Sequence, residues 1–230
     1  MTSVAVVMAG GNIHGRLLIE KLLEMHVEPR VIINEHHTER SKRLETFLKN
    51  DFYSPASLQD LDLNVQNVKD FASDEALSIL REISPSYIIN GGCGIFRENL
   101  LSIATCINVH PGMLPYFRGL DPVLWSLYYQ KPIGATVHKI SSGIDEGDIY
   151  LSKQLPWQGV GSVLELRLQC MSWGAELLGE FLKNPSDYTP RAQNESQARY
   201  FTKFPDENLR TVEENLKSYI PANGGNIFGL

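Results

Sequence analysis

The sequence contains little cysteine and has no long apolar run near its start. Its three cysteines, Cys93, Cys106 and Cys170, have no paired spacing and no other Cys/His grouping of metal type, so we expect reduced thiols rather than disulfides or metal ligands. The opening residues MTSVAVVMAGG carry no basic segment and only a short apolar run. We therefore expect neither a signal peptide nor a membrane anchor, and a cytoplasmic location.

Positive charge is also in short supply. Lys and Arg total 21 against 27 Asp and Glu, which gives a formal net charge of −6 and no general attraction to phosphate backbones or anionic lipids. We expect no nucleic-acid partner and no membrane partner. With 43% hydrophobic and 21% charged residues over 230 positions, the chain is typical of an ordinary globular protein with one large domain.

Apolar runs alternate with amphipathic segments along the first half of the chain. Residues 4–9 form a continuous apolar run closed by Gly10 and Gly11, which is typical of a buried strand, and leucines at helical spacing follow it. This alternation predicts an α/β fold whose mainly parallel sheet has helices on both faces. Further strands are expected at 31–33, 63–68, 87–90 and 105–109, and helices at 37–49, 74–83 and 123–130.

The second half predicts a hairpin and one long helix. Apolar segments at 134–140 and 148–155 flank a turn-forming stretch, and 161–183 has helical periodicity with Ser162 as its cap. The polar remainder suggests a strand at 200–202 and a helix at 206–219, too little for a core of its own. The expected organisation is therefore a main domain over 1–183 and a C-terminal extension over 184–230 that is not an independent domain.

Asn108 and His110 stand two positions apart at the end of an apolar run that Pro111 closes. Residues i and i+2 of a strand share a face, so the carboxamide and the imidazole are expected side by side. Ligands of open α/β sheets bind at the carboxyl ends of the strands, where this pair would emerge. The alternative is that Asn108 caps the following turn and His110 is a satisfied histidine.

Asp145 lies in the expected hairpin turn between Gly143 and Gly147. Together with Asn108 and His110 it would supply an oxyanion donor, a group that titrates near neutrality and a carboxylate that orients that group or relays a proton. An aspartate in a turn is otherwise ordinary turn chemistry. Cys106 could share the face of Asn108, but no nucleophile motif accompanies it, so we interpret it as a core thiol.

Two stretches, INVHPGMLPYFRGLDPVLWSL at 107–127 and IGATVHKISSGIDEGDIY at 133–150, resemble the folate-dependent formyltransferases: glycinamide ribonucleotide transformylase, methionyl-tRNA formyltransferase and the sugar N-formyltransferases. The resemblance covers about 1–183. It implies a Rossmann-like catalytic domain that transfers a formyl group from 10-formyltetrahydrofolate to a primary amine without a metal. It also implies the catalytic set Asn108, His110 and Asp145. His138 matches a second family histidine, either as support for the site or as a structural residue.

The resemblance also implies where the two substrates bind. The pterin would contact Gly94, Ile95, Phe96, Arg97, Ile140, Ser141 and Gly143. Arg97 either pairs with a carboxylate of the folate or is an ordinary surface arginine. The acceptor side would include Gly11, Asn12, Tyr116, Arg118 and Gly119.

The glycines after the first strand also raise the alternative of a dinucleotide site, with Glu35 placed to bind a ribose. Their spacing does not fit G-x-G-x-x-G, and a glycine turn between strand and helix is common packing. A helix start can still hold an anion, so this loop is expected to face a phosphate of the acceptor.

The segment 115–122, together with Trp125, Ser126 and Asp148, resembles the sugar N-formyltransferases more than the purine enzyme. The expected acceptor is a nucleotide-linked amino sugar or a similar small metabolite, and a homodimer is possible by the same resemblance. Two alternatives remain open. One is a formyltetrahydrofolate hydrolase that uses water as acceptor, and the other is a non-catalytic folate-binding protein on the same fold.

Overall fold

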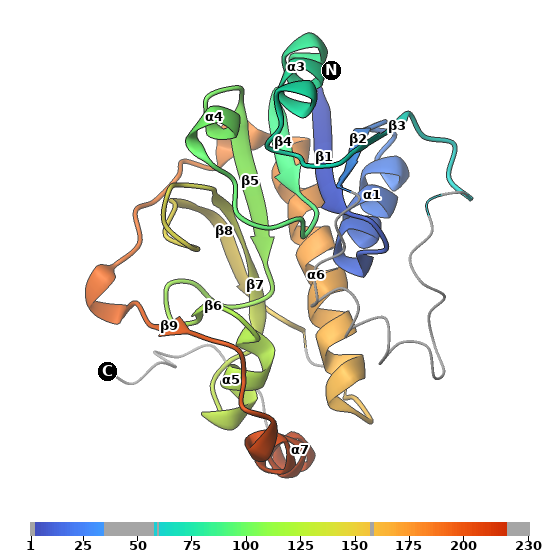
Figure 1. Ribbon diagram of the computed structural model, residues 1–230. Coiled ribbons are helices and arrows are strands. Elements are labelled where there is room, and N and C mark those ends of the chain that lie inside the picture. Colours follow the sequence, from blue (N-terminus) through green and yellow to red (C-terminus); the bar gives the residue numbers. More distant parts are fainter. Residues whose placement is uncertain (1–2, 35–57, 59, 157–158, 220–230) are drawn as a thin grey trace. The chain divides into compact units, whose positions relative to one another are not determined.

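The computed structural model describes residues 3–34, 58, 60–156 and 159–219, and the chain forms two compact units, Met1–Asn108 and Val109–Leu230. The mainly parallel α/β sheet predicted from the sequence is confirmed (Figure 1). Its strand order is β3 (Val65–Val68), β2 (Arg30–Asn34), β1 (Val4–Ala9), β4 (Tyr87–Asn90), β5 (Thr105–His110), β7 (Gly134–Lys139) and β8 (Ile149–Gln154). Strand β5 begins in the first unit and ends in the second.

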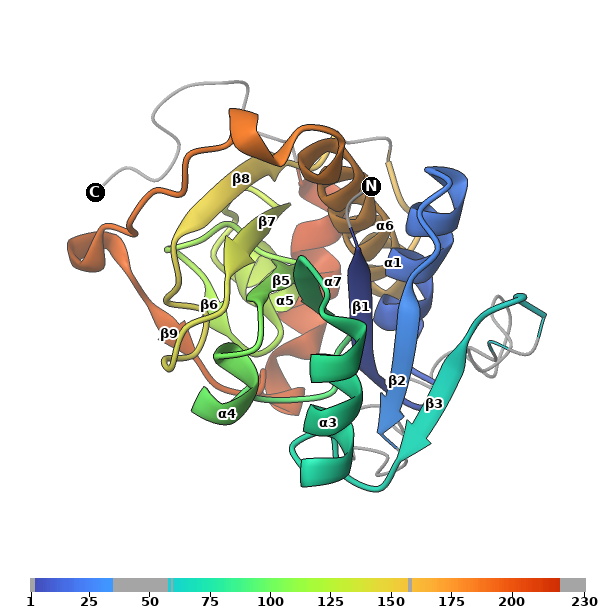
Figure 2. The same cartoon turned by 90° about the horizontal axis from the view of Figure 1, so that it is seen from above.

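The first unit is built around β1, in which every residue is buried. Val6 of β1 is in register with Val31 of β2 and Ile89 of β4, and both pairings are parallel. In the strand order, the connection from β1 to β2 leads toward β3. The connection from β3 to β4 leads in the opposite direction, toward β8. Right-handed crossovers therefore place α1 (Ile13–Glu24) and α3 (Asp74–Ile83) on opposite faces, as Figure 2 shows.

Capping side chains start both helices of the first unit. Asn12 accepts from the N–H groups of His14 and Gly15 at the start of α1, and Ser73 does the same for Ala76 in α3. The short helix α4 (Glu98–Leu101) begins directly after Arg97. The helix expected at 37–49 lies outside the described residues.

In the second unit, the expected hairpin and long helix are both present. Strands β7 and β8 pair in antiparallel fashion, and α6 (Val163–Lys183) packs along them. Ser162 caps α6 by accepting from the N–H of Glu165. Gly174 allows α6 to approach the sheet, because a Cβ at this position would lie 2.7 Å from the side chain of Val109.

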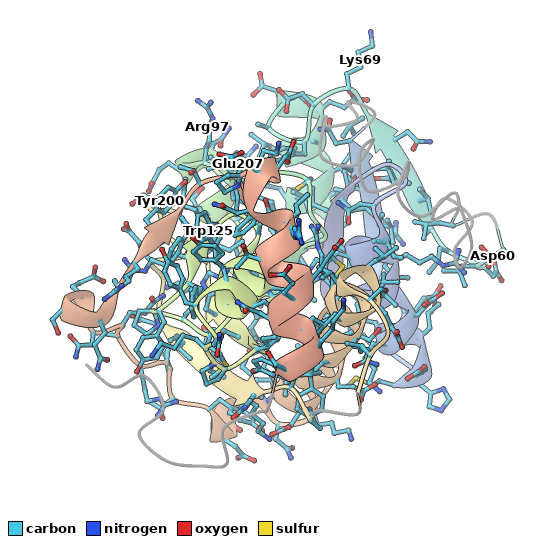
Figure 3. All side chains as sticks on the ribbon, turned by 90° about the horizontal axis from the view of Figure 1, so that it is seen from below. Asp60, Lys69, Arg97, Trp125, Tyr200 and Glu207 are labelled. Atoms are coloured by element: carbon cyan, nitrogen blue, oxygen red, sulfur yellow. The ribbon has the colours of Figure 1, made fainter. Side chains whose placement is uncertain are left out.

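The C-terminal segment packs into the second unit. Strand β9 (Tyr200–Phe201) pairs in parallel with β6 (Arg118–Gly119). Trp125 donates to the carbonyl of Thr202, and Figure 3 labels Trp125 and Tyr200 on this part of the unit. Helices α5 (Pro122–Tyr128) and α7 (Leu209–Ser218) enclose a core with α6. That core contains Val123, Leu124, Leu127, Leu166, Cys170, Phe204, Val212 and Leu216.

Three short 3-10 helices complete the described elements: η1 (Pro185–Asp187), η2 (Glu195–Gln197) and η3 (Asp206–Asn208). Within the described part of the chain, no helix combines the length and apolarity needed to cross a membrane.

Candidate active site

His110 is the last residue of β5, and its side chain is buried. The Nε2 atom lies 2.6 Å from the carbonyl oxygen of Phe117. A carbonyl can only accept, so Nε2 carries a hydrogen in this contact. The other ring nitrogen, Nδ1, lies 3.5 Å from Oδ2 of Asp145. The structure therefore brings together two of the three residues expected to carry the chemistry.

Asp145 lies in the turn between β7 and β8 with a positive φ of 55°. Its Oδ2 atom accepts a 2.8 Å hydrogen bond from the N–H of Gly119, and its side chain is only 12% exposed. The close packing of this turn requires glycine at 147, because a Cβ there would collide with the carbonyl oxygen of Lys139. Backbone packing thus fixes where the carboxylate lies.

His138, whose role the sequence left open, lies on the other side of Asp145. Its Nε2 atom is 3.6 Å from Oδ1 of Asp145, and its Nδ1 atom is 2.9 Å from the carbonyl oxygen of Lys139. The pairing of β7 with β8 shifts register between Val137 and His138, and such a bulge re-aims a side chain. The sequence contains no signal for this bulge, so the contact of His138 with Asp145 could not be predicted.

The two histidines keep Asp145 ionised. Burial alone would raise the pKa of this carboxyl group. The charge on His110, the hydrogen bond and charge of His138 and the N–H of Gly119 outweigh burial and hold the pKa below the usual value. Asp145 is therefore a carboxylate at neutral pH, enclosed between two imidazoles that each bond a backbone carbonyl through their far nitrogen.

Thr136 of β7 holds the loop that follows His110. Its buried Oγ1 atom donates to the carbonyl of Gly112 at 2.8 Å and accepts from the N–H of Leu114 at 3.2 Å. Gly112 in turn packs against His110, where a Cβ would lie 2.8 Å from Nε2. One hydroxyl group therefore connects the strand that carries His138 to the loop that covers His110.

Asn108, the third expected catalytic residue, ends the first unit. It is half-buried in β5 and in register with Asn90 of β4. Its place at the carboxyl end of a parallel strand is the expected one. Its catalytic role stays a prediction.

Four of the residues expected to contact the pterin follow β4 in the first unit. Gly94 has a φ of 121° and is exposed, as are Ile95 and Arg97. Phe96 is buried and packs against Phe71 with ring centroids 5.8 Å apart. Of these four residues, Phe96 contributes its side chain to the core of its unit.

The remaining expected pterin residues, Ile140, Ser141 and Gly143, lie in the second unit and are all half-buried. They precede Asp145 in the turn between β7 and β8. A Cβ on Gly143 would collide with the carboxylate of Glu146, so glycine is needed for this turn to close.

The residues expected on the acceptor side lie in both units. In the first, Gly11 has a φ of 72°, and Asn12 donates to the carbonyl of Gly92 at 3.1 Å besides capping α1. In the second, the hydroxyl of Tyr116 lies 3.5 Å from Gln197. The guanidinium of Arg118 is buried and bonds Gln193 and Glu195, and Gly119 holds Asp145.

No cluster of three or more His, Cys, Asp or Glu side chains suited to a metal ion occurs among the described residues. The site thus offers imidazole, carboxylate and backbone N–H groups at the end of a parallel strand. Groups of this kind at the carboxyl end of a strand in an α/β fold suit proton transfer and the stabilisation of an oxyanion. Residues 3–163 match the family model of formyl transferases, and the chain belongs to that family.

Curated relatives include methionyl-tRNA formyltransferases. That of Ehrlichia ruminantium (strain Welgevonden) is 32% identical over 148 residues, which cover 63% of this chain and 49% of the relative. That of Fervidobacterium nodosum is 32% identical over 170 residues, covering 68% of this chain and 53% of the relative. The chain spans about half the length of these relatives.

Solved structures share the fold at lower identity. A sugar N-formyltransferase from Shewanella has a TM-score of 0.64 at 22% identity and covers 86% of this chain and 76% of its own. Glycinamide ribonucleotide transformylase 1 from Symbiobacterium toebii has a TM-score of 0.60 at 19% identity, with coverages of 84% and 95%. An N-formyltransferase from Helicobacter canadensis, solved with folinic acid and dTDP-3-aminofucose, has a TM-score of 0.61 at 19% identity, with coverages of 88% and 71%.

Proposed function

We propose that the chain is a folate-dependent N-formyltransferase that transfers a formyl group from 10-formyltetrahydrofolate to a primary amine. The observation that carries this proposal is the ionised Asp145 between the imidazoles of His110 and His138 at the carboxyl end of β5. Family membership supplies the reaction class, and the local geometry supplies the groups that such a reaction needs.

The proposed roles follow from the charge of each group. A neutral amine attacks the formyl carbon, and the bond from that carbon to N10 of the folate breaks. Asn108 stabilises the oxygen that gains negative charge, and the imidazolium of His110, whose two ring nitrogens face Phe117 and Asp145, stabilises that oxygen through its positive charge. A carboxylate with a lowered pKa holds a proton poorly, so Asp145 keeps His110 charged and oriented and passes the proton that the amine loses to N10, the leaving nitrogen of the folate.

We assign the formyl donor, as the family resemblance implies, to Gly94, Ile95, Phe96 and Arg97 and to Ile140, Ser141 and Gly143. Exposed backbone around Gly94 and the half-buried turn suit a flat heterocycle that needs backbone hydrogen bonds. Structural relatives solved with folinic acid or 5-N-formyltetrahydrofolate support a reduced folate as the donor.

The acceptor that we favour is the amine of a nucleotide-linked amino sugar or a comparable small metabolite. Support comes from the sugar N-formyltransferases among the structural relatives, one of them solved with dTDP-3-aminofucose. Methionyl-tRNA is the second candidate, because the curated relatives at 32% identity are named methionyl-tRNA formyltransferases. The net charge of −6 gives this chain no general attraction to a phosphate backbone, so the small acceptor ranks first.

One assay separates these possibilities. The protein is incubated with 10-formyltetrahydrofolate and, in separate reactions, nucleotide-linked amino sugars, simple amines, methionyl-tRNA or no acceptor, and formylated product and formate are measured by mass. Formylated amino sugar supports the proposal. Product on methionyl-tRNA alone would correct the acceptor, and stoichiometric formate without any amine would identify a hydrolase. Folate binding without turnover on any acceptor would contradict the enzyme.

The role of His110 is tested with His110→Asn, for which His26→Asn is the matched control. His26 is exposed at the end of α1 and has a positive φ of 58°, which asparagine tolerates. We expect His110→Asn to lower kcat by about 100-fold or more, because a positive charge that stabilises the oxyanion is lost. Equal rates for the two variants would reject the proposed site.

A further inference from the structure

One side chain of the C-terminal segment spans the turn that carries Asp145. The Nε2 atom of Gln193 donates to the carbonyl of Asp145 at 2.8 Å and to the carbonyl of Gly147 at 2.7 Å. Both hydrogens of the carboxamide are therefore used, one on each side of the turn. The two acceptors are the carbonyls of Asp145, which has a positive φ, and of Gly147, which packs against Lys139. The backbone has little freedom to adjust at these two positions.

The other end of the same carboxamide is fixed by Arg118. The Oε1 atom of Gln193 accepts from Nε and Nη2 of Arg118 at 3.0 and 2.9 Å. A guanidinium can only donate and a carbonyl can only accept, so the amide has a single orientation that satisfies all four bonds. Arg118 is itself held by Glu195 at 3.0 and 2.7 Å and is buried.

These contacts hold Asp145 at two places. Arg118 and Gly119 are consecutive residues of β6. Gly119 binds the carboxylate of Asp145 directly, and Arg118 binds its main-chain carbonyl through Gln193. The short strand β6 thus fixes both the side chain and the backbone of Asp145. Its contact with the backbone passes through Gln193, which lies 48 positions after Asp145 in the chain.

We infer that Gln193 is a positioning residue, which sets the distance of the Asp145 carboxylate from His110 by clamping the turn to Arg118. The expected effect on kcat rests on the proposed function. The expected effect on the distance between Asp145 and His110 does not. The inference also assigns a part in the site to the segment after α6, and it gives Arg118 a supporting role behind the carboxylate.

Two substitutions at Gln193 test the clamp. Gln193→Met removes all four hydrogen bonds without adding charge. Gln193→Glu keeps an oxygen for Arg118 but faces the carbonyls of Asp145 and Gly147 with a second acceptor. We expect both to lower kcat by up to about 100-fold, as misplacing a reacting group by about 1 Å can do, with KM for either substrate changed by less than about threefold.

Gln130→Glu is the matched control. It makes the same substitution at an exposed glutamine of the same unit, whose side chain contacts Asn215 and lies outside the Arg118 network. Kinetics near those of the unaltered protein are expected. Equal loss of kcat in Gln130→Glu and Gln193→Glu, or a rise in KM at unchanged kcat in the Gln193 variants, would overturn the inference, because either result points to a role other than placing Asp145.

A measurement without turnover separates this inference from the proposed function. The imidazole ¹⁵N and ring proton resonances of His110 report its contact with Asp145 whether or not an acceptor is known. We expect them to shift in Gln193→Met and to stay in place in Gln130→Glu, with both variants folded by circular dichroism. Unchanged His110 resonances in folded Gln193→Met would overturn the inference even if formyl transfer is confirmed. If the resonances shift but the protein formylates no acceptor, the positioning role of Gln193 is supported and the proposed reaction is rejected.

Discussion

The N–H of Gly119 donates a 2.8 Å hydrogen bond to Oδ2 of Asp145, although 26 positions separate the two residues. Gly119 has a φ of 93°, and a Cβ on it would collide with the carbonyl of Phe201. Only glycine thus permits β6 to pair with β9 and present its N–H to the carboxylate. The C-terminal segment and the Asp145 turn meet at this residue.

Replacing Asp145 with asparagine should remove most of the activity. Asparagine keeps the shape and an acceptor for Gly119 but cannot stabilise a charged His110. We expect kcat to fall by about 100- to 1,000-fold with the fold retained, measured as formylated product by mass. Asp187→Asn is the control, because it makes the same substitution at an exposed aspartate of the same unit. Loss of activity in both variants to the same extent would contradict a specific role for Asp145.

The same substitution predicts a pH-dependent difference in stability. The pKa of Asp145 is lowered in the folded state, so its carboxylate stabilises the fold above the unfolded-state pKa, and this contribution is lost as pH falls through the folded-state value. The difference in free energy of unfolding between the unaltered protein and Asp145→Asn should favour the unaltered protein at about pH 5 and shrink below about pH 4. Urea denaturation at several pH values measures it. A difference that does not change with pH would show that the two histidines do not stabilise the carboxylate.

Thr136→Val should destabilise the second unit. Valine has nearly the shape of threonine but leaves the carbonyl of Gly112 and the N–H of Leu114 without their buried partner. We expect a loss of about 1–3 kcal/mol in the free energy of unfolding. Thr202→Val, at an exposed position, is the control for urea denaturation. Equal midpoints for the two variants would contradict the structural role of Thr136.

The three thiols should react slowly in the native protein. Cys93, Cys106 and Cys170 are buried thiols outside any disulfide, and burial raises the pKa of Cys93 well above the usual value and that of Cys170 to about 12. The thiolate attacks the disulfide reagent, and Cys93 and Cys170 rarely form a thiolate near neutral pH, while burial shields Cys106 from the reagent. We expect three thiols to react in denaturant and slow reaction without it. A rapidly reacting thiol in the native protein would be inconsistent with this packing.

The sequence predicted most elements because their signals are local. The continuous apolar run of β1, the cap of α6 at Ser162 and the alternation of strands with helices all depend on neighbours within a few positions. Strand β6 and its pairing with β9 gave no such signal, because two-residue strands have no periodicity. The bulge that aims His138 at Asp145 is likewise a property of two paired strands.

The sequence by itself determined which chemical groups this protein brings to its site and, through local pattern and motif, the family of folds that carries them. The tertiary structure decided how those groups are held. It placed a second imidazole on the far side of Asp145, used Arg118 as an internal support and brought Gln193 to the turn from the C-terminal segment. The physical reason is that hydrogen-bond partners are chosen by distance in space after the core has packed, and partners as far apart as Asp145 and Gln193, 48 positions, leave no mark of that choice in a single sequence.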